Sequence, residues 1–254
     1  MTKIITIAGQ KGGTGKSVTA VNFAASLALL EQKTLLIDTD PQGCSTKWCG
    51  LKPSEDTSDL TSIFTGRSQV MDAVAKTQVQ YMDVIPAGFD LFQAALKLSR
   101  HAGNEKILRI FLKDIQGEYE YIIIDSPSSF SFLTITAMMA ADSLVVCTTS
   151  DQNTSGDFQS LLAMVKYIRH THDISLKILG FLFNRCKILS CGKICIDDRH
   201  LFNTEQMMPD IFIPEDDTIR QSIESAVPCA LYDIKSPAAR AYLNFANQMH
   251  CFFK

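Results

Sequence analysis

The chain has 254 residues, a mass of 28.1 kDa, a formal net charge of −3 and 46% hydrophobic residues. This composition is typical of a compact folded protein, and it excludes a chain that coats nucleic acid or an anionic membrane through net charge alone. No apolar run approaches the roughly 18 to 20 residues that cross a bilayer, and the N-terminus turns polar too early for a signal peptide. We therefore expect a cytoplasmic protein whose contacts with any polyanion come from a local basic patch.

The chain contains eight cysteines, which fit a cytoplasmic protein if they are thiols. One cluster deserves separate consideration, and it consists of Cys186, Cys191, Cys195 and His200. Its spacing is irregular compared with the Cys-x2-4-Cys pairs that begin most zinc sites. We favour ordinary thiols in a loop over a metal site.

Short apolar runs alternate with longer segments of helical period along most of the chain. The runs that predict buried strands are residues 3–8, 34–37, 82–85, 121–124, 144–148 and 178–183. The segments that predict helices include residues 18–30, 105–115 and 156–170. Repeated strand–helix–strand units predict an α/β fold, with a doubly wound and mostly parallel sheet covered by helices on both faces. No linker divides the sequence, so we expect one domain over residues 1–254.

A glycine-rich segment, Gly9-Gln10-Lys11-Gly12-Gly13-Thr14-Gly15-Lys16-Ser17, follows the first predicted strand and precedes a helix. This context is typical of a phosphate-binding loop, in which glycines let backbone N–H groups approach phosphate oxygens. The helix N-terminus adds partial positive charge, the Lys16 ammonium can reach the β- and γ-phosphates, and the Ser17 hydroxyl can hold Mg²⁺. The alternative is a glycine-rich turn that binds no ligand.

Gln10 stands where a standard Walker A motif has glycine, and a second lysine, Lys11, follows it. The run Lys11–Ser17 resembles the deviant Walker A box of the ParA/MinD family of ATPases. The resemblance implies a P-loop NTPase fold and an ATP-dependent homodimer in which Lys11 reaches the partner's nucleotide, as an arginine finger does; the alternative is a solvated lysine. It assigns ATP binding to residues 11–18, namely Lys11, Gly12, Gly13, Thr14, Gly15, Lys16, Ser17 and Val18. Lys11 and Lys16 are also candidate catalytic residues.

Two aspartate-containing segments extend the resemblance. Asp38-Thr39-Asp40-Pro41-Gln42-Gly43 is similar to the family's switch segment, which implies that Asp40 orients or deprotonates the attacking water. We expect Asp38 only to cap the turn. Tyr121-Ile122-Ile123-Ile124-Asp125 has the Walker B form, which implies that Asp125 reaches Mg²⁺ through water beside Ser17. The following Pro127-Ser128-Ser129 departs from the family's usual Pro-Pro sequence.

The resemblance continues to about residue 245. Phe183-Asn184-Arg185 ends a predicted strand where relatives have an adenine-reading Asn or Asp, so Asn184 is a candidate adenine contact. An asparagine that only forms the turn is the alternative. Ile213-Pro214 resembles the segment before the loop that packs on the base, and Pro214 is therefore a second candidate ATP contact.

In this family the nucleotide cycle controls dimerisation and binding to a surface. A partition ATPase of the small Soj type would bind non-specific DNA with ATP, would work with a ParB-like centromere-binding partner and would be nucleoid-associated. Non-specific DNA binding needs only cations against phosphates, and the candidates are Arg185, Lys187, Lys193, Arg199 and Arg220. The acidic run Glu215-Asp216-Asp217 argues against this surface.

Three alternatives are open. One is a MinD-like or client-positioning ATPase that acts through a protein or membrane surface, and another is a module in which ATP locks a dimer with negligible turnover. A small-substrate kinase is less favoured because no segment resembles a lid. The C-terminal segment 241–254 has an apolar stripe and few cations, so we expect it to pack on the domain and not to be a stable membrane anchor.

Overall fold

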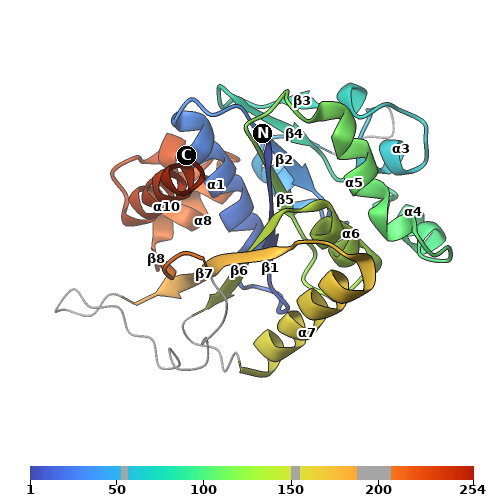
Figure 1. The fold of residues 1–254 in the computed structure, drawn as a ribbon. Coiled ribbons are helices and arrows are strands. Elements are labelled where there is room, and N and C mark those ends of the chain that lie inside the picture. The colour runs from blue at the N-terminus through green and yellow to red at the C-terminus, as the bar shows by residue number, and fades with distance from the viewer. Residues whose placement is uncertain (53–56, 150–154, 188–206) are drawn as a thin grey trace.

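A computed structural model describes residues 1–52, 57–149, 155–187 and 207–254, and for residues 155–158 it describes the backbone alone. The described residues form an eight-stranded sheet in the order β3-β4-β2-β5-β1-β6-β7-β8 (Figure 1). The strands are β1 (Lys3–Ala8), β2 (Thr34–Asp38), β3 (Ala75–Lys76), β4 (Met82–Ile85), β5 (Tyr121–Asp125), β6 (Ser143–Thr149), β7 (Lys177–Cys186) and β8 (Ile211–Pro214). Every pair is parallel except β3 with β4, at one edge. The predicted mostly parallel sheet is confirmed.

Helices cover both faces of the sheet (Figure 1). One face of the sheet is covered by α1 (Lys16–Leu29), α2 (Cys44–Trp48), α8 (Asp217–Glu224), α9 (Cys229–Tyr232) and α10 (Pro237–Phe253). The other face has α3 (Leu60–Phe64), α4 (Leu91–Leu98), α5 (Ile107–Leu112), α6 (Phe132–Ala140) and α7 (Ser155–His172). Single 3₁₀ turns are η1 (Met71–Ala73), η2 (Asn104–Lys106) and η3 (Lys113–Ile115). The doubly wound α/β class is therefore confirmed.

The strands are buried on both sides because each face of the sheet carries its own hydrophobic core. In β1, Ile4 and Ala8 join one core, whereas Ile5 and Ile7 join the other. This alternation places apolar side chains at successive positions, and so explains why the strand has a continuous hydrophobic sequence instead of an alternating one. All six predicted strands are present, and β8 is an additional parallel strand that the sequence pattern did not reveal.

The segment predicted as one helix over residues 105–115 is divided into η2, α5 and η3. Its helical period is nevertheless real, because Leu108, Leu112 and Ile115 are buried in the core beneath it. Turns of 3₁₀ type are common at the ends of α-helices, where they tighten the first or last turn. The prediction was thus right about the buried face and wrong about the continuity of the α-helix.

The C-terminal helix α10 packs against α1. The Phe245 ring stacks on Phe23 with 4.2 Å between the centroids, and Tyr242, Ala246 and Met249 are buried alongside. Its apolar stripe therefore belongs to the core, as predicted from its sequence. Within the described residues, none of the helices has the length and apolarity needed to span a bilayer.

Because every strand except β3 runs in the same direction, the carboxyl ends of these parallel strands meet at one edge of the sheet. The glycine-rich loop follows β1, the Asp40 segment follows β2, Asp125 ends β5 and Asn184 lies near the end of β7. Residues far apart in sequence are thereby collected at this edge, such as Thr14 and Asn184, which are 170 positions apart. We refer to it as the carboxyl edge and to the opposite side as the amino edge.

Candidate nucleotide-binding site

The glycine-rich loop turns sharply between β1 and α1. Gly13 and Gly15 have φ angles of +78° and +84°, in a region that residues with a Cβ rarely adopt. A Cβ placed at Gly12 or Gly13 would meet no atom within 4 Å, so the loop borders open space on that side. This open space at the N-terminus of a 14-residue helix is the arrangement that a phosphate group requires.

The two lysines of the loop differ in burial. Lys16 is only 6% exposed, and its Nζ donates to the Lys11 carbonyl oxygen at 2.9 Å and lies 3.5 Å from Thr14 Oγ1. Burial lowers the pKa of Lys16, and this effect is opposed by the nearby Cys147, Asp125 and Asp40. The side chain of Lys11, in contrast, is exposed. One lysine is therefore held inside the loop while the other lies at its surface.

Asp38 and Asp40 have different surroundings at the end of β2. Asp38 is fully buried, and its Oδ2 accepts from Thr46 N and Thr46 Oγ1, both at 2.8 Å. Its Oδ1 accepts from the Asp40 backbone N–H at 3.1 Å, so it holds the turn as expected. Burial raises the pKa of Asp38 to about 6, although these hydrogen bonds oppose the rise. Asp40 is half-buried, and its Oδ1 accepts from Gln42 N at 3.0 Å.

Asp125 ends β5 and has no exposed surface. Its Oδ2 accepts a 2.6 Å hydrogen bond from Ser45 Oγ, whereas Oδ1 is a buried atom without a hydrogen-bond partner among the described residues. Burial, followed by the charge of Asp38, raises the pKa of Asp125 to about 8, and the side chains of Ser45 and then Ser17 partly offset the rise. A buried carboxylate oxygen without a donor, beside a serine hydroxyl, fits an oxygen-seeking cation such as Mg²⁺.

The predicted adenine contacts lie at the carboxyl edge. Asn184 is 5% exposed, and its Nδ2 donates to the Thr14 carbonyl at 2.8 Å and to Thr19 Oγ1 at 3.3 Å. The amide therefore touches the phosphate loop itself, and its contact with adenine stays a prediction. Pro214 is buried in β8, in register with Cys186 of β7. Cys186 Sγ is 3.1 Å from the Phe183 carbonyl.

The structure describes three of the five predicted DNA contacts. Arg185 and Lys187 are exposed where β7 ends, close in sequence to Asn184. Arg220 of α8 forms an exposed ion pair with Glu224, with 3.2 Å between Nη1 and Oε1. Lys193 and Arg199 lie outside the described residues, as do Cys191, Cys195 and His200 of the cysteine cluster. No metal-binding cluster of His, Cys, Asp or Glu occurs in the part that the structure describes.

Sequence reasoning missed three side chains that complete the site. Ser45 binds Asp125, Thr46 binds Asp38, and Tyr242 reaches Asn184 from α10. The two α2 residues follow the switch segment directly, so their position was a usable signal. Nothing local marks Tyr242, because its partner is 58 residues away in sequence.

Comparisons with known proteins agree with this geometry. A family model described as an AAA domain matches residues 2–178. The chromosome partitioning protein ParA of Caulobacter vibrioides is 32% identical over 252 residues, covering 97% of this chain and 93% of the relative. The sporulation initiation inhibitor protein Soj of Bacillus subtilis is 31% identical over 250 residues, covering 98% of each chain.

The chain belongs to the ParA/MinD family of P-loop ATPases.

A solved member of the ParA/MinD family extends the likeness to three dimensions. The septum site-determining protein MinD of Pyrococcus horikoshii, complexed with Mg-ADP, matches with a TM-score of 0.80 and 25% identity. The match covers 98% of this chain and 96% of that one. The family's fold is thus reproduced along almost the whole chain, including the carboxyl edge where the phosphate loop lies.

Proposed function

We propose that this chain is an ATP-binding and slowly hydrolysing dimerisation switch, which partitions a plasmid or chromosome through ATP-dependent, non-specific DNA binding. The observation that carries the proposal is the pair of lysines in the phosphate loop. Lys16 is buried in the loop and Lys11 is exposed. This difference supports a division in which Lys16 serves the nucleotide of its own subunit and Lys11 serves a nucleotide bound by a second copy. The high similarity to proteins named ParA and Soj supports partition as the purpose.

The residues of the carboxyl edge fit ATP and Mg²⁺ as cofactors. Backbone N–H groups of residues 11–18 would hold the phosphates, with the Lys16 ammonium against their charge. Ser17 and, through water, Asp125 would hold Mg²⁺, which supplies neutralisation of phosphate charge when it is bound. A bound metal would also give the buried Asp125 Oδ1 a favourable electrostatic partner.

The proposed hydrolysis uses two side chains at the rim of the loop. The half-buried Asp40 carboxylate would orient the attacking water or take its proton. Lys11 of a second copy would stabilise charge that develops on the transferred phosphoryl group, because a cation placed there acts most strongly in the transition state. Turnover would therefore require dimerisation, which couples the chemistry to the switch.

Phosphate release from radiolabelled ATP tests the chemistry. The wild type should release phosphate slowly, a ParB-like partner with DNA should accelerate it, and Asp40→Ala should lose it while it still binds ATP. Asp114→Ala, at an exposed carboxylate of η3, is the matched control and should behave as the wild type. A wild type that binds ATP and releases no phosphate under any of these conditions would contradict hydrolysis, and would leave the ATP-locked binding module.

DNA retention tests the surface. Fluorescence anisotropy with a non-specific duplex should show binding at low salt with ATP and little binding with ADP. The affinity should fall steeply with salt, because each phosphate contact contributes about −0.9 to the slope of log K against log[salt]. Charge reversal of Arg185, Lys187 and Arg220, which are all exposed, should weaken binding. Absence of binding at low salt would rule out the partition proposal.

A client-positioning ATPase is the second candidate, and one observation favours it. A pocket of about 480 Å³ lies beside Asp40, and its wall includes Phe92 and Leu96 of α4, whose side chains are 61% and 47% exposed. Exposed apolar groups of this kind suit an apolar side chain of a protein partner. If the wild type shows no ATP-dependent DNA binding and Phe92→Ser with Leu96→Ser abolishes the stimulation of ATP hydrolysis by a purified protein partner, this second function is favoured.

A further inference from the structure

A buried polar cluster lies directly behind the phosphate loop, on the side away from the open space. Its members are Thr14 of the loop, Thr19 of α1, Asn184 of β7 and Tyr242 of α10. None of the four side chains is more than 5% exposed. The cluster joins the loop to the C-terminal helix, although the two are more than 220 residues apart in sequence.

The donors and acceptors of this cluster can be assigned in one consistent order. The Tyr242 hydroxyl donates to Asn184 Oδ1 at 3.4 Å, and Asn184 Nδ2 donates to Thr19 Oγ1 at 3.3 Å and to the Thr14 carbonyl at 2.8 Å. The Thr19 hydroxyl lies 3.4 Å from the Tyr242 oxygen and can donate to it. Burial raises the pKa of Tyr242, so its hydroxyl keeps its proton. The two ends of the amide therefore face different partners, a donor at Oδ1 and acceptors at Nδ2.

The contact with Thr14 bears on the nucleotide through the Thr14–Gly15 peptide. A trans peptide points its C=O and its N–H in opposite directions, and the described chain has no cis peptide. Because the Thr14 carbonyl points at Asn184, the Gly15 N–H points away from it. A Cβ at Gly15 would lie only 2.6 Å from Asn184 Nδ2, so the amide packs closely against the outer side of the loop. The Gly15 N–H is thereby directed to the inner side, where a phosphate binds.

We propose that Tyr242 is a positioning residue for nucleotide binding, which fixes the orientation of the Asn184 amide and, through it, the Gly15 N–H. Without the hydroxyl, the Asn184 oxygen loses its donor in a buried site, and the amide is free to rotate away from Thr14. The loop would then bind phosphate less tightly, while the groups that act on the bound nucleotide would be unchanged. The C-terminal helix thus contributes directly to ATP affinity.

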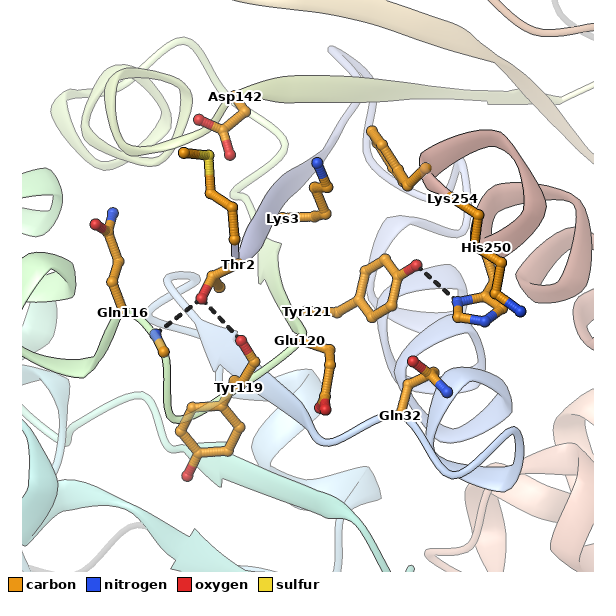
Figure 2. Close-up of a pocket in the computed structure, with 13 residues that line it drawn as sticks. Thr2, Lys3, Gln32, Gln116, Tyr119, Glu120, Tyr121, Asp142, His250 and Lys254 are labelled. Atoms are coloured by element: carbon orange, nitrogen blue, oxygen red, sulfur yellow. Dashed lines mark hydrogen bonds between the residues drawn. The ribbon is translucent and has the colours of Figure 1, made fainter.

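The other end of α10 offers a matched control. Figure 2 shows the amino edge of the sheet, where a pocket of about 620 Å³ is lined by residues of both chain ends. There the Tyr121 hydroxyl forms a 3.1 Å hydrogen bond with His250 Nδ1 of α10. Tyr121 and Tyr242 are both buried tyrosines, and the hydroxyl of each forms a hydrogen bond that connects α10 to the sheet. The two hydrogen bonds lie at opposite edges of the sheet. Tyr121→Phe therefore removes a comparable bond without touching the loop.

The test compares the affinity of Tyr242→Phe and Tyr121→Phe for a fluorescent ADP in the presence of Mg²⁺. Tyr242→Phe should raise the Kd roughly three- to tenfold, the size expected for one buried hydrogen bond. Its turnover at saturating ATP should stay within about twofold of the wild type, so that KM changes and kcat does not. Tyr121→Phe should leave the Kd within about twofold, and thermal unfolding should show that both variants are folded at the assay temperature. Equal Kd values for the wild type and Tyr242→Phe would overturn the proposal.

A double-mutant cycle separates positioning from a general loss of packing. Asn184→Ala should raise the Kd at least as much as Tyr242→Phe, and the double variant should be no weaker than Asn184→Ala alone, because both changes remove the same path to Thr14. Additive effects would contradict a shared path. If Tyr242→Phe does not fold, Asn184→Asp decides the matter: a carboxylate cannot donate to Thr14, so an unchanged Kd for this variant also overturns the proposal.

This inference rests on nucleotide binding at the loop, which is one part of the proposed function. Phosphate release and DNA retention are measured separately from the ADP affinity. Their absence in the wild type would contradict the switch, whereas the ratio of Kd values between Tyr242→Phe and the wild type would still decide the role of Tyr242.

Discussion

Ser45 donates a 2.6 Å hydrogen bond from its Oγ to Oδ2 of Asp125, between two side chains with no exposed surface. The bond connects α2, which begins directly after the switch segment, to the end of the Walker B strand. It leaves only Oδ1 of Asp125 to face a cation, and it fixes the rotation of the carboxylate. This hydrogen bond therefore connects the segment that follows Asp40 directly to the proposed metal ligand.

Ser45→Ala should weaken Mg²⁺ binding, because it removes the group that orients the proposed ligand. Loss of such a supporting hydrogen bond typically lowers metal affinity by about tenfold or more. We expect a corresponding rise in the Mg²⁺ concentration that gives half-maximal ATP turnover. Ser126→Ala is the control, since the Ser126 hydroxyl donates to the Ile7 carbonyl at 2.8 Å and not to the carboxylate. The same Mg²⁺ requirement in all three proteins would contradict this role.

Gly12→Ala and Gly15→Ala should have different effects. The first adds a methyl group only to the space proposed for the ligand, whereas the second also adds one where the folded chain is closely packed. A Cβ at Gly12 meets nothing within 4 Å, so the fold should tolerate it, while ATP binding weakens because the methyl group enters the phosphate-binding space. A Cβ at Gly15 meets Asn184 at 2.6 Å, and the φ of +84° adds strain. Gly15→Ala should therefore lose ATP binding and about 1–3 kcal/mol of stability. Urea unfolding and calorimetric titration with ADP check both, and a stable Gly15→Ala would be evidence against the close contact.

Alanine substitutions of the two loop lysines should have different effects on nucleotide binding and dimerisation. Lys16→Ala should abolish ATP binding, because it removes the buried ammonium of the subunit's own site. Lys11→Ala should keep ADP affinity within a few-fold and lose the ATP-dependent dimer, because its exposed side chain is proposed to act on a second copy. Light scattering with a non-hydrolysable ATP analogue, beside ADP titration, distinguishes them. An unchanged dimer in Lys11→Ala would refute the trans role.

Phe245→Ala should destabilise the protein strongly. The ring is 1% exposed and stacks on Phe23 at 4.2 Å, so its removal leaves a cavity between α10 and α1. Buried Phe→Ala changes lose about 3–5 kcal/mol of unfolding free energy. Phe252 of the same helix is 39% exposed, and Phe252→Ala should lose about 1 kcal/mol or less. Equal losses in urea unfolding would show that α10 is not anchored through Phe245.

Much of this architecture follows from local sequence patterns. The apolar runs predicted β1 with its observed bounds, and the order of strand, glycine-rich turn and helix predicted the loop that follows it. The aspartates could be assigned to one edge because the carboxyl ends of parallel strands must meet. The patterns did not reveal β3, which has two residues, or β8, a four-residue strand that ends in proline. Neither strand has a period long enough to recognise.

The supporting hydrogen bonds of the site were also beyond prediction. Ser45 and Asp125 are 80 positions apart, and Tyr242 and Asn184 are 58 apart, so only the folded chain brings each pair together. Asn184 also has a contact that could not be predicted from sequence. The family resemblance implied a contact with adenine, which stays a prediction, and it did not reveal that the amide also donates to the Thr14 carbonyl of the loop.

The contact between Lys3 and Phe253 at the amino edge has a practical consequence. The Lys3 ammonium lies 5.0 Å from the centre of the Phe253 ring, so residues near both numbered ends of the chain are neighbours there (Figure 1). The phosphate loop begins at the other end of the six-residue β1, about 20 Å away. A fluorophore attached near Lys3 or Phe253 would therefore report on association without standing at the carboxyl edge, where we propose that a second copy binds.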